Sequence, residues 1–136
     1  MQRLSSSYKI SHVCVNNAEY PSKINDKLIM QCKEKEGESL LKRIDSLDFV
    51  IALNLNRKEM DSVEFSSFIT NLLENGIGSL VFVIGGSYGL GENLLGRANF
   101  ELTLSKMTLL HEMSIVFILE QIYRAVNIVN KTPYHK

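Results

Sequence analysis

Apolar residues follow two different patterns along this chain. Residues 48–55, 80–84 and 100–104 are almost continuously apolar, which is typical of strands covered on both faces of a parallel sheet. Residues 9–15 alternate apolar and polar side chains and predict an earlier strand. The pattern therefore predicts four strands.

Helical spacing occupies the stretches between these strands. Apolar residues recur every three or four positions from residue 22 or 25 to 44, from 61 to 75 and from 111 to about 129, with a shorter pattern at 92–98. Asp61 followed by Glu64 predicts a capping box, and Asn75-Gly76 predicts the end of the same helix. Gly37 interrupts the first helix at a cost of about 1 kcal/mol relative to alanine. The charged run at residues 33–36 is interpreted as the solvent-exposed face of that helix.

Strands that alternate with helices long enough to cross over a sheet define the α/β class. We therefore expect a parallel sheet with helices on both faces, built as one domain from residues 1–136. Residues 54–58 should turn the chain out of the second strand. Ligands of open α/β sheets bind beyond the carboxyl ends of the strands, so the bends after residues 84 and 104 are the expected site.

Composition narrows the function classes only a little. The 136 residues are 45% hydrophobic and 22% charged, as in ordinary globular proteins, and 15 basic residues balance 15 acidic ones. A net charge of zero gives no overall field that attracts a polyanion, so nucleic-acid binding needs a local basic patch. No apolar run approaches the roughly 20 residues needed to cross a membrane, and residues 1–5 lack the apolar core expected of a signal peptide. A cytoplasmic protein without membrane contact is expected.

A metal site is not expected. Cys14 and Cys32 do not form a CxxC pair, and His12, His111 and His135 are scattered without a carboxylate at ligand spacing. Both cysteines are interpreted as small buried apolar residues in a reducing compartment.

A glycine-rich segment, Gly85-Gly86-Ser87-Tyr88-Gly89-Leu90-Gly91, follows the third predicted strand. A strand, a glycine turn and a helix start expose backbone N–H groups and suit nucleotides. The spacing differs from the dinucleotide fingerprint, and no Walker lysine-serine pair is present. A structural turn and a nucleotide cradle therefore fit the pattern equally well.

Two histidines and the basic, aromatic tail are the other candidates for chemistry. His111 and His135 can accept protons near neutral pH, although capping or surface positions would explain them as well. Lys131, Tyr134, His135 and Lys136 follow Arg124 and form a cluster of the kind that binds phosphates and stacks a base. A solvated terminus would have the same composition.

Four motifs in order resemble one family. The segments FVIGGSYGL (82–90), LSKMTL with His111 (104–111), EQIYRA (120–125) and PYHK (133–136) closely resemble the ribosomal RNA large subunit methyltransferase H family, as does KEKEG at 33–37. The resemblance runs from about Leu4 to the last residue.

The resemblance implies a SPOUT-class fold, in which a parallel sheet carries a C-terminal trefoil knot. It also implies a homodimer that uses S-adenosyl-L-methionine to methylate N3 of a pseudouridine in 23S ribosomal RNA. From the resemblance we expect that the family's N-terminal strand and helix would precede Met1 and are missing here. Asn54, Arg57 and Leu110 stand where the family has an acidic residue, a glycine and a proline.

Site residues follow from the same resemblance. The expected cofactor contacts are Leu53, Gly85, Gly86, Leu104, Ser105, Lys106, Met107, Thr108 and Leu109. The expected substrate-side residues are His111, Arg124, Tyr134 and His135, with a histidine or a bound water as the proton acceptor. The tail can reach the site of the partner subunit in this interpretation.

Two other functions remain open from the sequence. A diverged or truncated homologue could keep the dimer, and even cofactor binding, without catalysis. A flavodoxin-like nucleotide-binding or regulatory module also fits the strand and helix order, although the acidic triad and phosphate motif of that class are absent.

Overall fold

The computed structural model describes residues 11, 13, 22–86 and 88–136. The elements within these ranges are α1 (Asp26–Leu41), β1 (Phe49–Glu59), α2 (Ser62–Glu74), β2 (Leu80–Val83), α3 (Glu92–Arg97), β3 (Phe100–Thr103) and α4 (His111–Val129). Except for residues 11 and 13, the strand predicted at 9–15 lies outside the described residues. The predicted α/β class is confirmed by this order.

The three described strands form a parallel sheet in the order β2-β1-β3. Val50 is opposite Val81 of β2, and Ile51 is opposite Phe100 of β3. The central strand β1 is buried over Val50, Ile51 and Ala52, which explains its unbroken apolar sequence.

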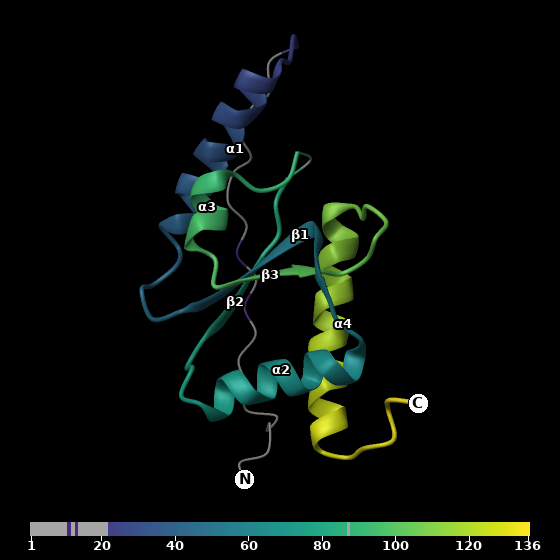
Figure 1. Cartoon of the computed structure of the whole chain (residues 1–136). Coiled ribbons are helices and arrows are strands. Elements are labelled where there is room, and N and C mark those ends of the chain that lie inside the picture. The colour runs from purple at the N-terminus through teal and green to yellow at the C-terminus, as the bar shows by residue number, and fades with distance from the viewer. Residues whose placement is uncertain (1–10, 12, 14–21, 87) are drawn as a thin grey trace.

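Helices cover both faces of the sheet, as predicted (Figure 1). On one face, α2 and α4 pack together over the side chains of Ile51 and Leu102. On the other face, α1 and α3 pack over Val50 and Val83. Successive residues of β1 thus point into two separate cores, as the two-residue period of a strand requires.

The predicted helix signals are confirmed with small shifts at the ends. The side chain of Asp61 accepts a hydrogen bond from Glu64 N–H, and Glu64 Oε1 accepts one from Asp61 N–H, so the capping box is complete. The helix ends at Glu74 with Asn75 as its C-cap, followed by Gly76 at a φ of 90°. Asn25 caps the start of α1 by accepting from Leu28 N–H.

The charged run of α1 corrects one expectation. Glu36 is only 7% exposed and does not belong to a solvent-exposed face. A Cβ atom built on Gly86 would lie 3.3 Å from a carboxylate oxygen of Glu36, so this side chain packs against the glycine segment. Gly37 lies beside α3, because a Cβ there would approach Asn93 Oδ1 to 2.3 Å. The glycine in α1 thus permits close contact between the two helices.

A second correction concerns the end of β1. Residues 54–58 do not turn out of the strand, which continues to Glu59 through a bulge. Leu53 and Lys58 both pair with Leu102 of β3, and Asn56 within the bulge has a left-handed φ of 56°. The chain leaves the strand pairing after Leu53 and pairs with β3 again at Lys58.

Candidate active site

Two bends beyond the carboxyl ends of β2 and β3 lie side by side. His111 begins α4 directly after the second bend, and its Nδ1 is 3.1 Å from the carbonyl oxygen of Gly85 in the first bend. A carbonyl oxygen only accepts hydrogen bonds, so His111 Nδ1 carries the proton in this contact. In the neutral ring, the lone pair then lies on Nε2.

The first bend is a tight glycine turn. Gly89 has a φ of +86°, and its N–H donates to the carbonyl oxygen of Gly86 at 3.0 Å. A Cβ atom on Gly85 would lie 2.6 Å from the carbonyl carbon of Gly89, which leaves no space for a side chain. Gly85 is therefore required by backbone packing, apart from any contact with a ligand.

The second bend, residues 104–109, exposes both backbone donors and apolar side chains. Within the described part of the chain, the N–H groups of Lys106, Thr108 and Leu109 have no hydrogen-bond partner, whereas Met107 N–H donates to Ser105 Oγ at 3.0 Å. The side chain of Met107 is 78% exposed. Backbone N–H groups without a partner, next to an exposed apolar side chain, suit a ligand that contains a heterocyclic ring.

Leu110 keeps the backbone shape that a proline would impose. It is the N-cap of α4 with a φ of −61°, close to the value that a pyrrolidine ring fixes. A proline at this position would fit the same backbone conformation.

Thr103 holds the bulge of β1 beside the second bend through two hydrogen bonds. The hydroxyl of Thr103 accepts from Arg57 N–H at 2.8 Å and donates to the carbonyl oxygen of Asn54 at 2.7 Å. Glu101 accepts from the side chains of Asn54 at 2.9 Å and Arg57 at 3.2 Å. Leu53, the expected cofactor contact, immediately precedes this bulge and pairs with Leu102.

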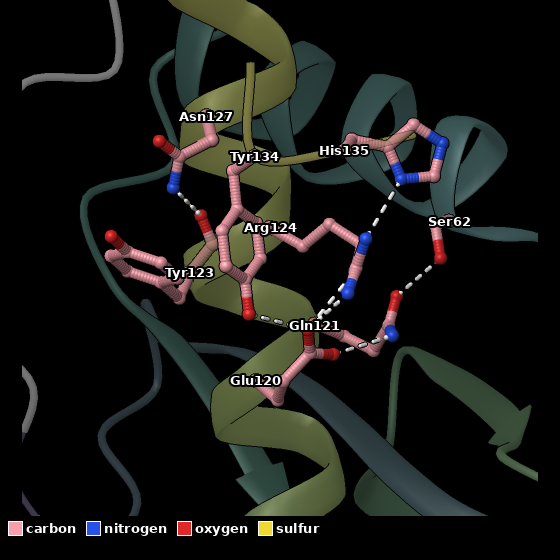
Figure 2. A network of polar contacts seen from close by, with 8 residues as sticks. All are labelled: Ser62, Glu120, Gln121, Tyr123, Arg124, Asn127, Tyr134 and His135. Atoms are coloured by element: carbon pink, nitrogen blue, oxygen red, sulfur yellow. Dashed lines mark hydrogen bonds and ion pairs between the residues drawn. The ribbon is translucent and has the colours of Figure 1, made fainter. Parts of the chain in front are cut away.

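Three of the four expected substrate-side residues form one polar network on α4 and the tail (Figure 2). Glu120 Oε1 accepts from Arg124 Nε at 3.0 Å, from Arg124 Nη2 at 2.7 Å and from the hydroxyl of Tyr134 at 3.1 Å. Arg124 Nη1 is 3.1 Å from His135 Nδ1. The guanidinium also lies 4.8 Å from the centre of the Tyr134 ring, within range of a cation–π interaction.

Charge in this network shifts three pKa values. The hydrogen bonds from Arg124 hold the pKa of Glu120 below its usual value, and the same contact raises the pKa of Arg124. The hydrogen bond to Glu120 raises the pKa of Tyr134, because it stabilises the protonated phenol. At neutral pH the network thus consists of a carboxylate, a guanidinium and a neutral phenol.

The network also ties the tail to α2. Gln121 donates from Nε2 to Glu120 Oε2 at 2.8 Å, and Ser62 Oγ donates to Gln121 Oε1 at 2.7 Å (Figure 2). Gln121 and Ser62 also line a cavity of about 220 Å³ that reaches Leu104 at the second bend. The cavity therefore lies between the second bend and the polar network.

His111 is separated from the other three substrate-side candidates. It begins α4, whereas Arg124 lies more than three turns further along, a rise of about 20 Å. Tyr134 and His135 pack beside Arg124 and not beside His111. One chain thus holds two half-sites at the two ends of one helix.

Sequence reasoning missed four side chains in these half-sites. Glu120 and Gln121 fell within a recognised motif but received no role, although the spacing of Glu120 and Arg124 is that of an i,i+4 ion pair. Ser62 and Thr103 carried no local signal, because their partners are distant in sequence.

Within the described ranges, no helix is both long and apolar enough to cross a membrane. Among the same residues, no group of three or more histidine, cysteine, aspartate or glutamate side chains is arranged to hold a metal ion.

Comparison with known proteins identifies the class to which this fold and site belong. A family model described as "Predicted SPOUT methyltransferase" matches residues 1–135. The chain therefore belongs to the SPOUT methyltransferase family.

Several relatives share one more specific name, "Ribosomal RNA large subunit methyltransferase H". The relative from Clostridium tetani (strain Massachusetts / E88) is 46% identical over 135 residues, which cover 99% of this chain and 85% of the relative. The relative from Clostridium botulinum (strain Hall) is 44% identical with the same coverage. The relative from Ureaplasma urealyticum serovar 10 is 41% identical over 136 residues, 100% of this chain and 86% of the relative. The resemblance drawn from the sequence motifs is thereby confirmed.

Proposed function

We propose that this chain is an S-adenosyl-L-methionine-dependent methyltransferase that modifies N3 of a pseudouridine in 23S ribosomal RNA. The family match over residues 1–135 and the names of the relatives support methyl transfer to ribosomal RNA. The observation that carries the proposal is the contact between His111 and Gly85. It joins the two bends that contain most of the proposed cofactor contacts.

The bends fit the proposed cofactor. Gly85 and Gly86 bring backbone close without side chains, and the unused N–H groups of residues 106, 108 and 109 can donate to an adenine. The exposed Met107 and the neighbouring Leu104 and Leu109 supply apolar surface. Ser105 holds the turn, because its hydroxyl accepts a hydrogen bond from Met107 N–H. Leu53 borders the proposed site from β1. When bound, the cofactor supplies an electrophilic methyl group.

The substrate side then needs alignment and proton removal. Arg124 offers a fixed cation for an RNA phosphate, and Tyr134 offers a ring on which a base can stack. The protein must hold the pyrimidine nitrogen in line with the methyl group and remove its proton. A histidine of the site or a bound water accepts that proton in this proposal.

A homodimer completes the site in this proposal. The two half-sites of one chain are about 20 Å apart along α4, too far to act on one base. The outer surface of α4 exposes Met113, Val116, Leu119 and Tyr123, which a second copy of the chain would cover. The tail of one subunit then lies next to His111 of the other.

The proposed fold and location follow the same family. We propose that residues 1–136 are one SPOUT domain whose C-terminal segment forms the trefoil knot. A ribosomal RNA substrate places the reaction in the cytoplasm. A non-catalytic homologue is not favoured, because the relatives are named as methyltransferases and the Glu120 network is assembled.

Methyl transfer to ribosomes tests the proposal. Purified protein is incubated with methyl-labelled S-adenosylmethionine and ribosomes from a strain that lacks the modification, and the modified nucleoside is identified by mass spectrometry. We expect one labelled N3-methylpseudouridine per ribosome. Replacing Tyr134 or His135 with alanine should lower turnover at least tenfold without changing cofactor affinity. Cofactor binding without transfer by the unaltered chain would support the non-catalytic alternative, and equal loss of turnover and affinity in the variants would contradict the assigned roles.

A further inference from the structure

The two histidines of the half-sites are held in opposite tautomers. His111 Nδ1 donates to the carbonyl oxygen of Gly85, which cannot donate in return. The neutral His111 ring therefore keeps its lone pair on Nε2. A lone pair on the outward nitrogen is what a proton acceptor requires.

His135 has the reverse arrangement. Its Nδ1 faces Arg124 Nη1 at 3.1 Å, and a guanidinium has donors but no acceptor. Nδ1 must therefore accept, which places the proton of the neutral ring on Nε2. Figure 2 shows this second nitrogen on the side of the ring turned away from Arg124. The only lone pair of the ring is occupied, so His135 presents a donor.

Glu120 makes this arrangement stable. It binds the guanidinium of Arg124 through both Nε and Nη2, which fixes the plane and direction of the group. The remaining nitrogen, Nη1, then points at His135. Gln121 and Ser62 hold the second oxygen of Glu120 in place from the direction of α2.

We propose that the two histidines divide the substrate chemistry across the proposed dimer, with His111 Nε2 of one subunit as the proton acceptor and Nε2–H of the partner's His135 as a hydrogen-bond donor to a carbonyl oxygen of the base. Glu120 and Arg124 are the positioning residues that impose the donor tautomer on His135. This inference rests on the proposed methyl transfer to N3 of a pseudouridine.

With these two groups, each proton and electron pair of the proposed methyl transfer is accounted for. The N3–H bond breaks and its proton bonds to His111 Nε2. The electron pair left on N3 forms the bond to the methyl group, whose bond to sulfur breaks with the pair remaining on sulfur. Negative charge that develops on the carbonyl oxygens beside N3 is stabilised by the donor from His135.

The tautomers can be measured directly in the full-length protein. Two-bond ¹H–¹⁵N correlation spectra distinguish the two neutral forms of each histidine ring, and signals are assigned with His111→Asn and His135→Gln variants. We expect Nδ1–H for His111 and Nε2–H for His135. Finding the opposite tautomer at either residue would overturn the inference, whether or not the protein transfers methyl groups.

Activity of matched amide variants separates the two roles. His111→Asn retains an N–H near Nδ1 for Gly85 but removes the base, so turnover should fall about 100-fold or more while cofactor affinity stays within twofold. His135→Gln retains an N–H near Nε2, so turnover should stay within about tenfold, whereas His135→Asn and His135→Ala should lose more. An active His111→Asn variant, or a His135→Gln variant as impaired as His135→Ala, would overturn the division of roles. A wild-type protein that transfers no methyl group would instead overturn the proposed function on which the division rests.

Discussion

The imidazole of His111 is hydrogen-bonded to the backbone of Gly85 at 3.1 Å, although 26 positions separate them in sequence. This contact links the loop after β2 to the first residue of α4. Any movement of the glycine turn therefore also moves the histidine that we propose as the proton acceptor.

A side chain at Gly85 should disrupt cofactor binding. In Gly85→Ala, the added Cβ would lie 2.6 Å from the backbone of Gly89, so the turn must shift. We expect at least a tenfold weaker affinity for S-adenosylmethionine by calorimetry. Gly96→Ala is the control, because nothing lies within 4 Å of its Cβ position and alanine favours the helix. Unchanged affinity in Gly85→Ala would contradict the placement of the cofactor at this turn.

Thr103 should contribute strongly to stability through the bulge of β1. Its hydroxyl is part of a 3% exposed residue, and its loss in Thr103→Val leaves Arg57 N–H and the Asn54 carbonyl without this partner. We expect the free energy of unfolding to fall by about 2 kcal/mol, measured with urea. The exposed Thr108 serves as the control, since Thr108→Val should stay within about 0.5 kcal/mol of the unaltered protein. Equal stability of both variants would show that the bulge does not need the hydroxyl.

The charge on Glu120 should contribute to stability at neutral pH and not in acid. Its pKa in the folded chain is held below the usual 4.5 by Arg124 and Tyr134. A carboxyl group of this kind stabilises the fold above the unfolded pKa, and that contribution disappears as the pH falls through the lower folded pKa.

Urea unfolding of wild type and Glu120→Gln at a series of pH values measures this effect. The difference in unfolding midpoint should be largest near pH 7 and shrink as the pH falls below 4.5. Tyr134→Phe removes only one of the donors to the carboxylate and should show a smaller difference. A difference that does not change with pH would mean that the charge of Glu120 is not what stabilises the network.

A charge on the outer face of α4 should separate the proposed dimer. Val116 is 60% exposed in the single chain, so Val116→Glu leaves folding intact but places a carboxylate in the subunit contact. Light scattering should show a particle of twice 15.4 kDa for the unaltered protein and of 15.4 kDa for the variant. Ser67→Glu on α2 is the control and should remain dimeric. A Val116→Glu variant that stays dimeric and active would place the subunit contact elsewhere.

Local sequence signals predicted most of the fold. Asp61 and Glu64 form the expected capping box, Asn75-Gly76 ends α2, and the apolar runs became parallel strands. These features depend on neighbours within a few residues or on a regular period. These features can therefore be predicted from the sequence alone.

Features that depend on distant partners were missed or wrong. The strand predicted to end near Leu55 continues to Glu59, because Thr103 and Glu101 bind the bulge from β3. Glu36 sits in a run of charges, yet it is buried where α1 packs against Gly86. Pattern analysis cannot detect such contacts, since each joins residues more than 40 positions apart.

The site was predicted as a set of residues but not as an arrangement. Arg124, Tyr134 and His135 do come together, and His111 does reach Gly85, but the two groups lie at opposite ends of α4. The roles given to the histidines depend on which nitrogen of each ring meets a donor or an acceptor, and only the three-dimensional contacts contain that information.

Backbone amide NMR during titration with S-adenosylmethionine tests the central claim most directly. We predict saturable binding of one molecule per chain, with the largest shifts at Gly85, Gly86 and residues 104–109. Absence of binding, or shifts confined to residues away from both bends, would contradict the account.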